Sequence, residues 1–591
     1  MMLPEINYIE QSKDIIEVFG GYNHTEAIKD GQFFEMTNLS ADNYPVLSAR
    51  NRREFVKEIN KPNGLTYTDK LAYVDGTEFY YNSTKICDVS DSEKTMVSMG
   101  AYLCIFPDKI ILNTETGNYF DMEAHYQSKG IIKVEPSTLN GSSIEYSEYE
   151  PAHVDGAYWL DEGVLKQWSN TYGMWLSVPT AYVRISEHID GEINEQFTDG
   201  FEEGDTVTFE GFLEESLNGD FSLYSCENGY MVIGSAVNQF EQEDVINIDR
   251  TAPDMDFVCE LNNRLWGCSS KNHEIYASKL GDPTNWRAYA GLVSDSYAVT
   301  VGSYGDFTGA IAHMGNVLFF KEGCVIKIYG TEPSNFTKTE IYCRGVEKGS
   351  EKSLAVLNEI LYYKSKDGIC AYDGTLPTSI SADLGNERYR NAVAGVTLNK
   401  YYVSMQDVNG NRHLFVYDTS KGIWNREDDE DIRFFAGAAG MLYYMNEDSL
   451  NIVRTQGKGK GLYPGMYFYV GKKRTELYPG MIYPGQIIND EYEENIEWSC
   501  ETGDMGTEYP DSKYISKIVV RVKTEGIFKM DIQYDSDGVW EPILDINDTG
   551  KSSITIPIKV RRCDHMKFRL RGTGQFRLYS ISKCIEMGSE P

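Results

Sequence analysis

A β-hairpin of similar form recurs along this chain, and it limits the fold more than any other feature. Each copy is two runs of alternating apolar and polar residues around a turn rich in Asp, Asn or Gly, which predicts two antiparallel strands. The copies span residues 71–86, 101–113, 263–280, 316–330, 359–374, 400–418 and 441–453. The last five are anchored, at intervals of 53, 43, 40 and 41 residues, by Leu265, Leu318, Leu361, Tyr401 and Leu442. Propeller blades repeat about every 40–50 residues. We therefore predict an all-β chain with a β-propeller of about six or seven blades.

Two departures from this spacing divide the chain. Residues 122–250 are acidic and have strand patterns of their own, which predicts a small β-barrel-like domain inserted between blades, because exposed loops tolerate insertions. After residue 493 five alternating segments follow one another, as in a jelly-roll or immunoglobulin-like sandwich. The predicted order is an extended N-terminal arm (1–50), first blades (51–121), inserted domain (122–250), remaining blades (251–455), a basic loop (456–492) and a C-terminal β-sandwich (493–591).

The basic loop is defined by three Tyr-Pro-Gly triplets. Pro followed by Gly favours a type II turn, and Pro gives no N–H to a strand ladder. Six basic residues and no acidic one lie between Arg454 and Arg474. We predict a gate or a membrane-contacting tip of a channel, with packing between subunits as the alternative. The residues assigned to it are Tyr463, Pro464, Gly465, Tyr467, Phe468, Tyr469, Lys472, Lys473, Arg474, Tyr478, Pro479, Gly480, Tyr483, Pro484 and Gly485.

The charge of the chain is strongly negative and unevenly distributed. The net charge is −35. From Lys513 to the end there are 14 Lys and Arg against 10 Asp and Glu, so the remainder carries about −39. A body this acidic is not a general nucleic-acid binder, which needs a basic surface. It could order subunits head to tail or line a channel that releases DNA; the alternative is a solvated acidic surface.

Residues that could carry chemistry are scattered and form no catalytic pattern. The run Glu427 to Asp431 is interpreted as a solvated loop rather than a cation site, and Ser365-Lys366-Asp367-Gly368 as a hairpin turn that lacks most of a sialidase Asp-box. The eight His show no ligand spacing for zinc, which needs four closed ligands. The eleven Cys are odd in number and form no CxxC pair, so free buried thiols are expected. We predict no catalytic residue, no metal and no cofactor.

Three short segments carry a resemblance to a known family. They are EIYASKLGDPTNW at 274–286, the entry region with Asn38-Leu39-Ser40, Tyr44-Pro45 and Ala49-Arg50, and the closing region around Arg562-Cys563-Asp564-His565 with Gly574 and Tyr579. With the predicted domain order, they resemble phage tail-nozzle proteins, also called packaged-DNA stabilisation proteins. The resemblance implies a virion component below the portal, in a ring that is most simply a hexamer, through which DNA leaves. The Tyr-Pro-Gly loop has no counterpart in this resemblance.

Three functions follow from these observations. The leading hypothesis is a structural tail nozzle or hub ring that contacts the portal, an adaptor or other tail proteins. Genomic DNA would pass through it without sequence-specific binding, and its far end would contact the host envelope. The second is a receptor- or carbohydrate-binding tail-tip or baseplate protein, and the third a polysaccharide-degrading enzyme. No segment has the pattern of a secretory signal or a membrane span, so we expect assembly in the host cytoplasm and residence in the virion tail.

Overall fold

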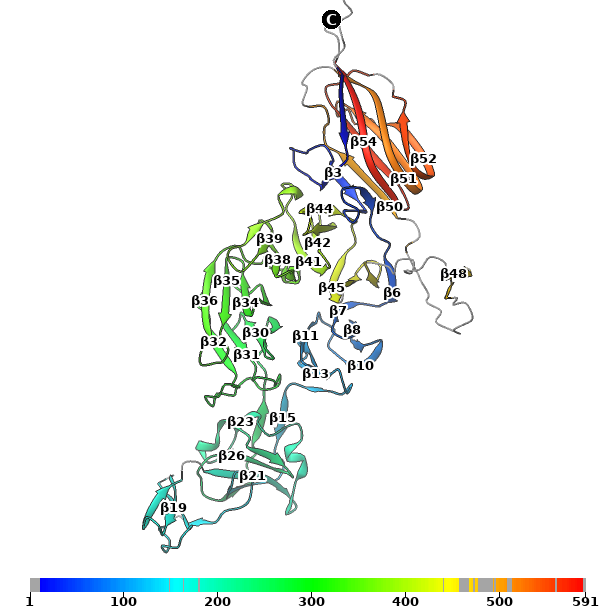
Figure 1. Ribbon diagram of the computed structural model, residues 1–591. Helices are drawn as coiled ribbons and strands as arrows, with labels where there is room; N and C mark the ends of the chain where they lie inside the picture. Colours follow the sequence, from blue (N-terminus) through cyan, green and yellow to red (C-terminus); the bar gives the residue numbers. More distant parts are fainter. Residues whose placement is uncertain are drawn as a thin grey trace, which may run out of the picture. The chain divides into compact units, whose positions relative to one another are not determined.

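Strands make up the regular structure of this chain (Figure 1). The computed structural model describes residues 11–147, 149–162, 164–178, 181–438, 440–455, 467–470, 473–476, 493, 496–507, 513–558 and 561–587. Within these residues the helices are four short 3₁₀ turns, η1 (Glu195–Thr198), η2 (Glu215–Leu217), η3 (Glu351–Ser353) and η4 (Ala382–Leu384). The all-β prediction is therefore confirmed. The chain divides into two compact units, the first formed by residues 1–93, 320–325 and 342–591, the second by 94–319 and 326–341.

Four small antiparallel sheets of the first unit follow one plan, in which four strands are hydrogen-bonded in chain order. Three are continuous in sequence: β7 (Pro62–Tyr67) to β10 (Thr84–Asp88) through β8 (Leu71–Asp75) and β9 (Glu78–Tyr81); β37 (Ala355–Leu357), β38 (Ile360–Ser365), β39 (Gly368–Tyr372) and β40 (Thr378–Ser379); and β41 (Arg390–Thr397), β42 (Lys400–Gln406), β43 (Arg412–Asp418) and β44 (Ile423–Arg426).

The fourth sheet joins two distant parts of the chain. It consists of β45 (Ile432–Ala438), β46 (Met441–Asn446), β47 (Asn451–Arg454) and, as its outer strand, β6 (Glu54–Glu58). The first strands of the four sheets are in contact in the order β37, β41, β45, β7. Apolar side chains between them, such as Tyr73, Met445 and Phe434, are buried in shared clusters. The four sheets thus stand side by side in an arc.

Three sheets of the same plan belong to the second unit, apart from residues 320–325 and 342 of the third sheet, which are assigned to the first unit. They are β11 (Thr95–Met99), β12 (Tyr102–Phe106), β13 (Ile110–Asn113) and β14 (Tyr119–Asp121); β29 (Phe257–Glu260), β30 (Leu265–Ser269), β31 (Glu274–Ala277) and β32 (Tyr297–Thr300); and β33 (Gly309–His313), β34 (Asn316–Lys321), β35 (Cys324–Tyr329) and β36 (Thr337–Tyr342). Here β11 contacts β29, and β29 contacts β33. All seven predicted hairpins lie on the middle strands of these seven sheets, so local alternation located them correctly.

The inserted segment begins and ends on neighbouring strands. β15 (Ala124–Gln127) pairs with β28 (Asn247–Arg250), and β23 (Thr206–Glu210) and β24 (Gly219–Ser222) complete that sheet. A second sheet has the order β25 (Ser225–Glu227), β26 (Tyr230–Gly234), β21 (Tyr182–Ile189), β16 (Ile131–Ser137), β27 (Phe240–Gln242), with β22 (Glu192–Ile193) beside β21. Side chains of both sheets form one apolar cluster. The sequence pattern predicted a single barrel-like module, whereas the structure has two open sheets over a shared core.

A further small sheet lies between β16 and β21 in the sequence, and no prediction covered it. It consists of β17 (Tyr146–Ser147), β18 (Tyr158–Asp161), β19 (Val164–Ser169) and β20 (Met174–Ser177). β17 runs parallel to β18, and the other pairs are antiparallel. We call this part, residues 138–178, the tryptophan module, because Trp159, Trp168 and Trp175 lie on it.

Both ends of the chain enter one ten-stranded sheet of the first unit (Figure 1). It contains β1 (Gln11–Ile16), β2 (Gly21–Tyr22), β3 (Gln32–Thr37), β4 (Leu39–Ser40) and β5 (Leu47–Ala49) together with β50 (Glu497–Thr502), β51 (Lys513–Tyr534), β52 (Glu541–Ile556), β53 (Met566–Thr573) and β54 (Phe576–Met587). The predicted arm at residues 1–50 is therefore corrected to strands of a sheet. Its apolar residues Phe33, Met36 and Leu39 are buried there, where an extended arm would expose them.

The long strand β51 replaces two strands that the sequence pattern predicted separately. Its first half pairs with β54 and its second half with β53, and the partner changes near Gly526. A Cβ at Gly526 would lie 2.1 Å from the carbonyl oxygen of Thr573, so only glycine permits this approach of two backbones. Trp498 of β50 stacks on Phe576 of β54 with ring centroids 3.8 Å apart. The sheet thus folds over its own core by means of one continuous strand, and not as five independent strands.

Candidate binding sites

The predicted gate loop lies largely outside the described residues. Within it the structure describes β48 (Tyr467–Val470) and β49 (Lys473–Glu476), which pair antiparallel with each other. In the described part of the chain they form a two-stranded sheet of their own. The three Tyr-Pro-Gly triplets and Lys472 lie outside the described residues. The role of this loop as a gate or tip stays a prediction.

The acidic run after β44 is ion-paired, so its interpretation as a solvated loop is wrong. Glu427 and Asp428 accept hydrogen bonds of 2.7 and 2.6 Å from the guanidinium of Arg53, which is only 5% exposed. Burial alone would lower the pKa of Arg53, but Asp428 and neighbouring acids raise it well above its usual value. The positive charges come from a segment more than 370 residues away in sequence. These carboxylates are therefore structural ligands for a buried arginine.

A second arginine connects the same region to the start of the C-terminal sheet. Arg50 donates two hydrogen bonds, of 2.7 and 2.8 Å, to the two carboxylate oxygens of Glu493. Burial would raise the pKa of Glu493, but its bonds to Arg50 hold that pKa below its usual value. Paired, planar geometry of this kind is the strongest form of ion pair. Arg50 and Arg53 together hold the entry segment against both the loop between β44 and β45 and the segment that precedes β50.

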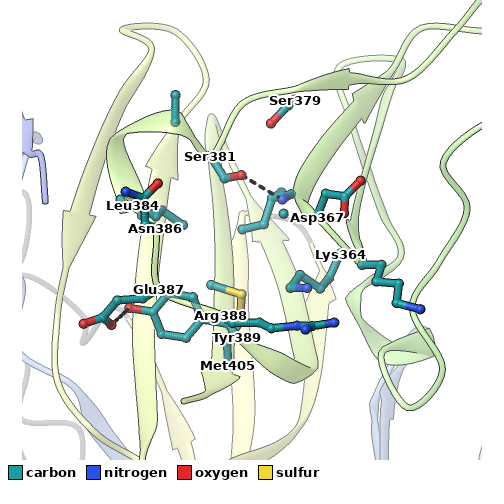
Figure 2. Close-up of a pocket in the computed structure, with 15 residues that line it drawn as sticks. Lys364, Asp367, Ser379, Ser381, Leu384, Asn386, Glu387, Arg388, Tyr389 and Met405 are labelled. Atoms are coloured by element: carbon teal, nitrogen blue, oxygen red, sulfur yellow. Dashed lines mark hydrogen bonds between the residues drawn. The ribbon is translucent and has the colours of Figure 1, made fainter. Parts of the chain in front are cut away.

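A pocket of the first unit lies among the β38–β39 hairpin, the segment from β40 through η4 to Tyr389, and Met405 of β42. It has a volume of about 460 Å³ and is lined by serine, acidic and basic side chains. Figure 2 shows Ser381, whose Oγ accepts a 3.0 Å hydrogen bond from the backbone N–H of Ile369, and Glu387, which accepts one of 2.7 Å from Tyr389. Burial and that bond raise the pKa of Tyr389.

Charged and polar side chains line this pocket. The lining residues include two serines, Ser379 and Ser381, together with acidic and basic residues, and they include no histidine. Lys364 donates to Glu347 and to the carbonyl of Ser365, at 3.0 and 2.5 Å, which engages its amine. The Ser365–Gly368 segment is the two-residue turn between β38 and β39, as the sequence predicted. The pocket is therefore a groove with a polar lining.

The tryptophan module carries a cluster of aromatic side chains. The ring of Trp175 lies 5.4 Å from the rings of both Trp159 and Trp168, tilted by 66° and 68°. His153 stacks on Trp168 with centroids 3.8 Å apart. The three indoles are only partly buried. The sequence contains a signal for this site, which the predictions above did not include, because three of the eight Trp lie within 17 residues.

Among the residues that the structure describes, no group of three His, Cys, Asp or Glu side chains is placed to hold a metal ion. No helix in the described ranges is long and apolar enough to span a bilayer. The eleven Cys are free thiols, and eight of them are buried.

Comparison with known proteins finds only weak similarity, at the level of the fold. No family model and no curated protein matches the chain. Among solved structures, BamB from Moraxella catarrhalis is similar at 11% identity and a TM-score of 0.30, over 70% of this chain and 99% of BamB. PorZ from Porphyromonas gingivalis is similar at 12% identity and a TM-score of 0.26, over 84% and 70%. The RRP9 WD40 repeats are similar at 8% identity and a TM-score of 0.28, over 71% and 99%. Scores this low carry no argument, so function is argued from this chain's own residues.

Proposed function

We propose that the seven four-stranded sheets are the blades of a single propeller. Each arc already has the side-by-side order of blades, with first strands in contact. The last sheet takes its outer strand, β6, from the start of the chain, which is how a ring of blades is closed. A propeller also removes the edges that isolated sheets would expose.

We further propose that the protein is a structural virion component, the nozzle or hub ring of a phage tail. The observation that carries this is the interlocking of the two chain ends. β1 pairs with β54, β3 with β50, and β6 with β47, and Arg50 joins Glu493 across more than 440 residues. Strand pairing of this kind keeps both ends of the chain from separating from the fold, which a protein under mechanical load requires. The sequence resemblance to tail-nozzle proteins supports the same role.

The charge distribution supports a channel that passes DNA without holding it. Basic contacts bind phosphates by releasing counterions, so a basic lumen would trap the genome. A chain with a net charge of −35 repels DNA instead. In this role the subunits form a ring, with a hexamer as the favoured number, next to the portal, an adaptor or other tail proteins. No catalytic step and no cofactor are part of the proposal.

Electron microscopy of the purified full-length protein tests this function. We expect closed rings with a central hole, with particle mass equal to a whole number of 67.0 kDa subunits. A sample that remains monomeric at micromolar concentration, or that forms compact trimers without a hole, would contradict the nozzle role. Labelled antibody against the protein should then bind at the tail of intact virions, and binding elsewhere on the particle would also contradict it.

A receptor- or carbohydrate-binding role is the second candidate. The partly exposed indole cluster of the tryptophan module favours it, since aromatic rings beside acidic side chains are suited to sugars. This role can coexist with a ring, because the module is a separate small sheet within the inserted segment.

A further inference from the structure

The three tryptophans of the module share one face of the sheet. Directly opposed residues on antiparallel strands point to the same side, and so do residues two apart on one strand. Trp159 on β18 opposes Lys166 on β19, and Trp168 on β19 opposes Trp175 on β20. Ser177 opposes Lys166 and lies on this face too. We call this face, with Trp159, Lys166, Trp168, Trp175 and Ser177, the indole face.

The other face of β18 and β19 is packed against the inserted domain. Leu160 and Leu165 oppose each other there and are only 9% and 7% exposed. They line one small cavity together with Pro136 of β16 and Tyr182 of β21. Because the apolar leucines already anchor the sheet, the indole face is turned away from that core. The indoles are thus not needed to attach the module.

The rings on the indole face are held in fixed orientations. Trp168 donates its indole N–H to Asn170 at 2.8 Å, and Trp175 donates its own to Glu150 at 3.0 Å. Glu150 also lies 3.1 Å from His153, and these two bonds hold the pKa of Glu150 below its usual value. The polar edges of these indoles are therefore satisfied within the protein. His153 stacks on one face of Trp168, so Trp159 and Trp175 are the rings that offer a ligand most of the aromatic surface, and this surface needs little ordering on binding.

The surroundings of this aromatic surface are polar and acidic. Residues 138–178 contain six Asp and Glu and one Lys. Like charges disfavour anionic lipid surfaces and nucleic acids at such a place. Tyr149 and Tyr172 of the same module are 81% and 71% exposed. A ligand that fits must therefore have weakly apolar C–H faces for the rings and hydroxyl groups for the carboxylates.

We propose that the indole face binds a neutral glycan chain. The C–H face of a pyranose ring packs on the electron-rich face of an aromatic ring, and sugar hydroxyls donate strong hydrogen bonds to carboxylates. Neutral sugars also avoid the repulsion that the acidic module imposes on phosphate and sulfate. The site is independent of the nozzle proposal, because it uses residues of the inserted segment alone.

Affinity electrophoresis of the full-length protein provides the test. The native protein is run in gels that contain one neutral polysaccharide each, galactomannan, α-glucan or β-glucan, and on an array of neutral bacterial oligosaccharides. We expect retardation in at least one gel or binding to at least one array glycan. The double variant Trp159→Ala, Trp175→Ala should weaken that binding by about tenfold or more, because each ring contributes stacking energy. Trp540→Ala, which removes a partly buried indole of the C-terminal region, should leave it unchanged.

A second variant keeps the test valid if the indole substitutions impair folding. Ser177→Arg leaves all three rings in place and puts a long side chain on the exposed indole face, so it should block glycan binding with an unchanged circular dichroism spectrum. Absence of binding to every polysaccharide and array glycan would overturn the proposal. Glycan binding that persists in both variants would also overturn it. So would a wild-type protein that binds phosphatidylglycerol vesicles and no glycan, if the variants lose the vesicle binding.

Discussion

At the scale of single residues, Arg53 is a buried side chain on which several acidic charges converge. It pairs with Glu427 and Asp428 and lies 3.6 Å from Glu430. Removing one partner of a buried ion pair leaves an uncompensated buried charge, which costs about 3–5 kcal/mol. Arg53→Ala should lower the free energy of unfolding of the unit that contains it by that order, measured by denaturant titration.

Arg561 is the matched control for Arg53. It is an exposed arginine with two carboxylate partners at 3.2 and 3.4 Å, and exposed pairs contribute about 0–1 kcal/mol. Arg561→Ala should therefore leave the denaturation midpoint nearly unchanged. Equal destabilisation by the two substitutions would show that burial at Arg53 does not matter.

His413 should make stability depend on pH near neutrality. Its Nδ1 lies 2.8 Å from Asp429 and its Nε2 3.4 Å from Asp407, while Arg426 lies 3.0 Å from Nδ1. The bond to Asp429 outweighs burial and Arg426, so the pKa of His413 is raised above 6.5. The charged ring therefore stabilises the fold fully below pH 6.5, and this contribution is lost as pH rises through the folded pKa.

The measurement is the melting temperature as a function of pH from about 6 to 8.5. The wild type should lose stability across this range relative to His413→Gln, which cannot titrate. The two curves should separate most at the acidic end. Parallel curves, or a wild type that gains stability relative to the variant as pH rises, would contradict the assigned direction.

At the scale of elements, the crossing of β51 from β54 to β53 depends on Gly526. A methyl group there would meet the backbone of Thr573, a fixed neighbour that cannot rotate away. Overpacking of this kind costs about 1–3 kcal/mol. Gly526→Ala should lower the unfolding midpoint, while Gly550→Ala on β52, where a Cβ meets nothing within 4 Å, should not. Similar midpoints for the two variants would mean that the backbones can separate at no cost.

The sequence predicted elements whose partners are local, and missed those whose partners are distant. Hairpins such as β42–β43 were found because alternation and turn residues lie within about 20 residues of each other. β3 pairs with β50, which lies more than 460 residues away. The sequence of residues 32–37 does not indicate which distant strand will pair with it. Glu427 looked solvated for the same reason, since its counter-ion Arg53 is supplied by a distant segment.

The indole face shows a different limit of prediction. The cluster of Trp159, Trp168 and Trp175 is visible in the sequence, but a shift of one residue in strand register would send these side chains to the opposite face. Only the pairing of Trp168 with Trp175, and the burial of Leu165 on the other side, fix which face is outward. Composition could thus locate the site but not assign it to a surface.

At the scale of the whole molecule, the uneven charge predicts how subunits associate. Residues 1–512 carry about −39, whereas the chain from Lys513 to the end carries +4. If the basic end of one subunit contacts the acidic body of the next, salt should weaken the ring, because the screening length falls from about 10 Å at 0.1 M to about 3 Å at 1 M salt. We expect rings at about 0.1 M NaCl and smaller species at about 1 M, as measured by mass photometry.

Reversal of three exposed basic residues, Lys523→Glu, Lys529→Glu and Arg561→Glu, should prevent ring formation even at low salt. Rings that survive both high salt and charge reversal would show that apolar surface, and not charge, holds the subunits together.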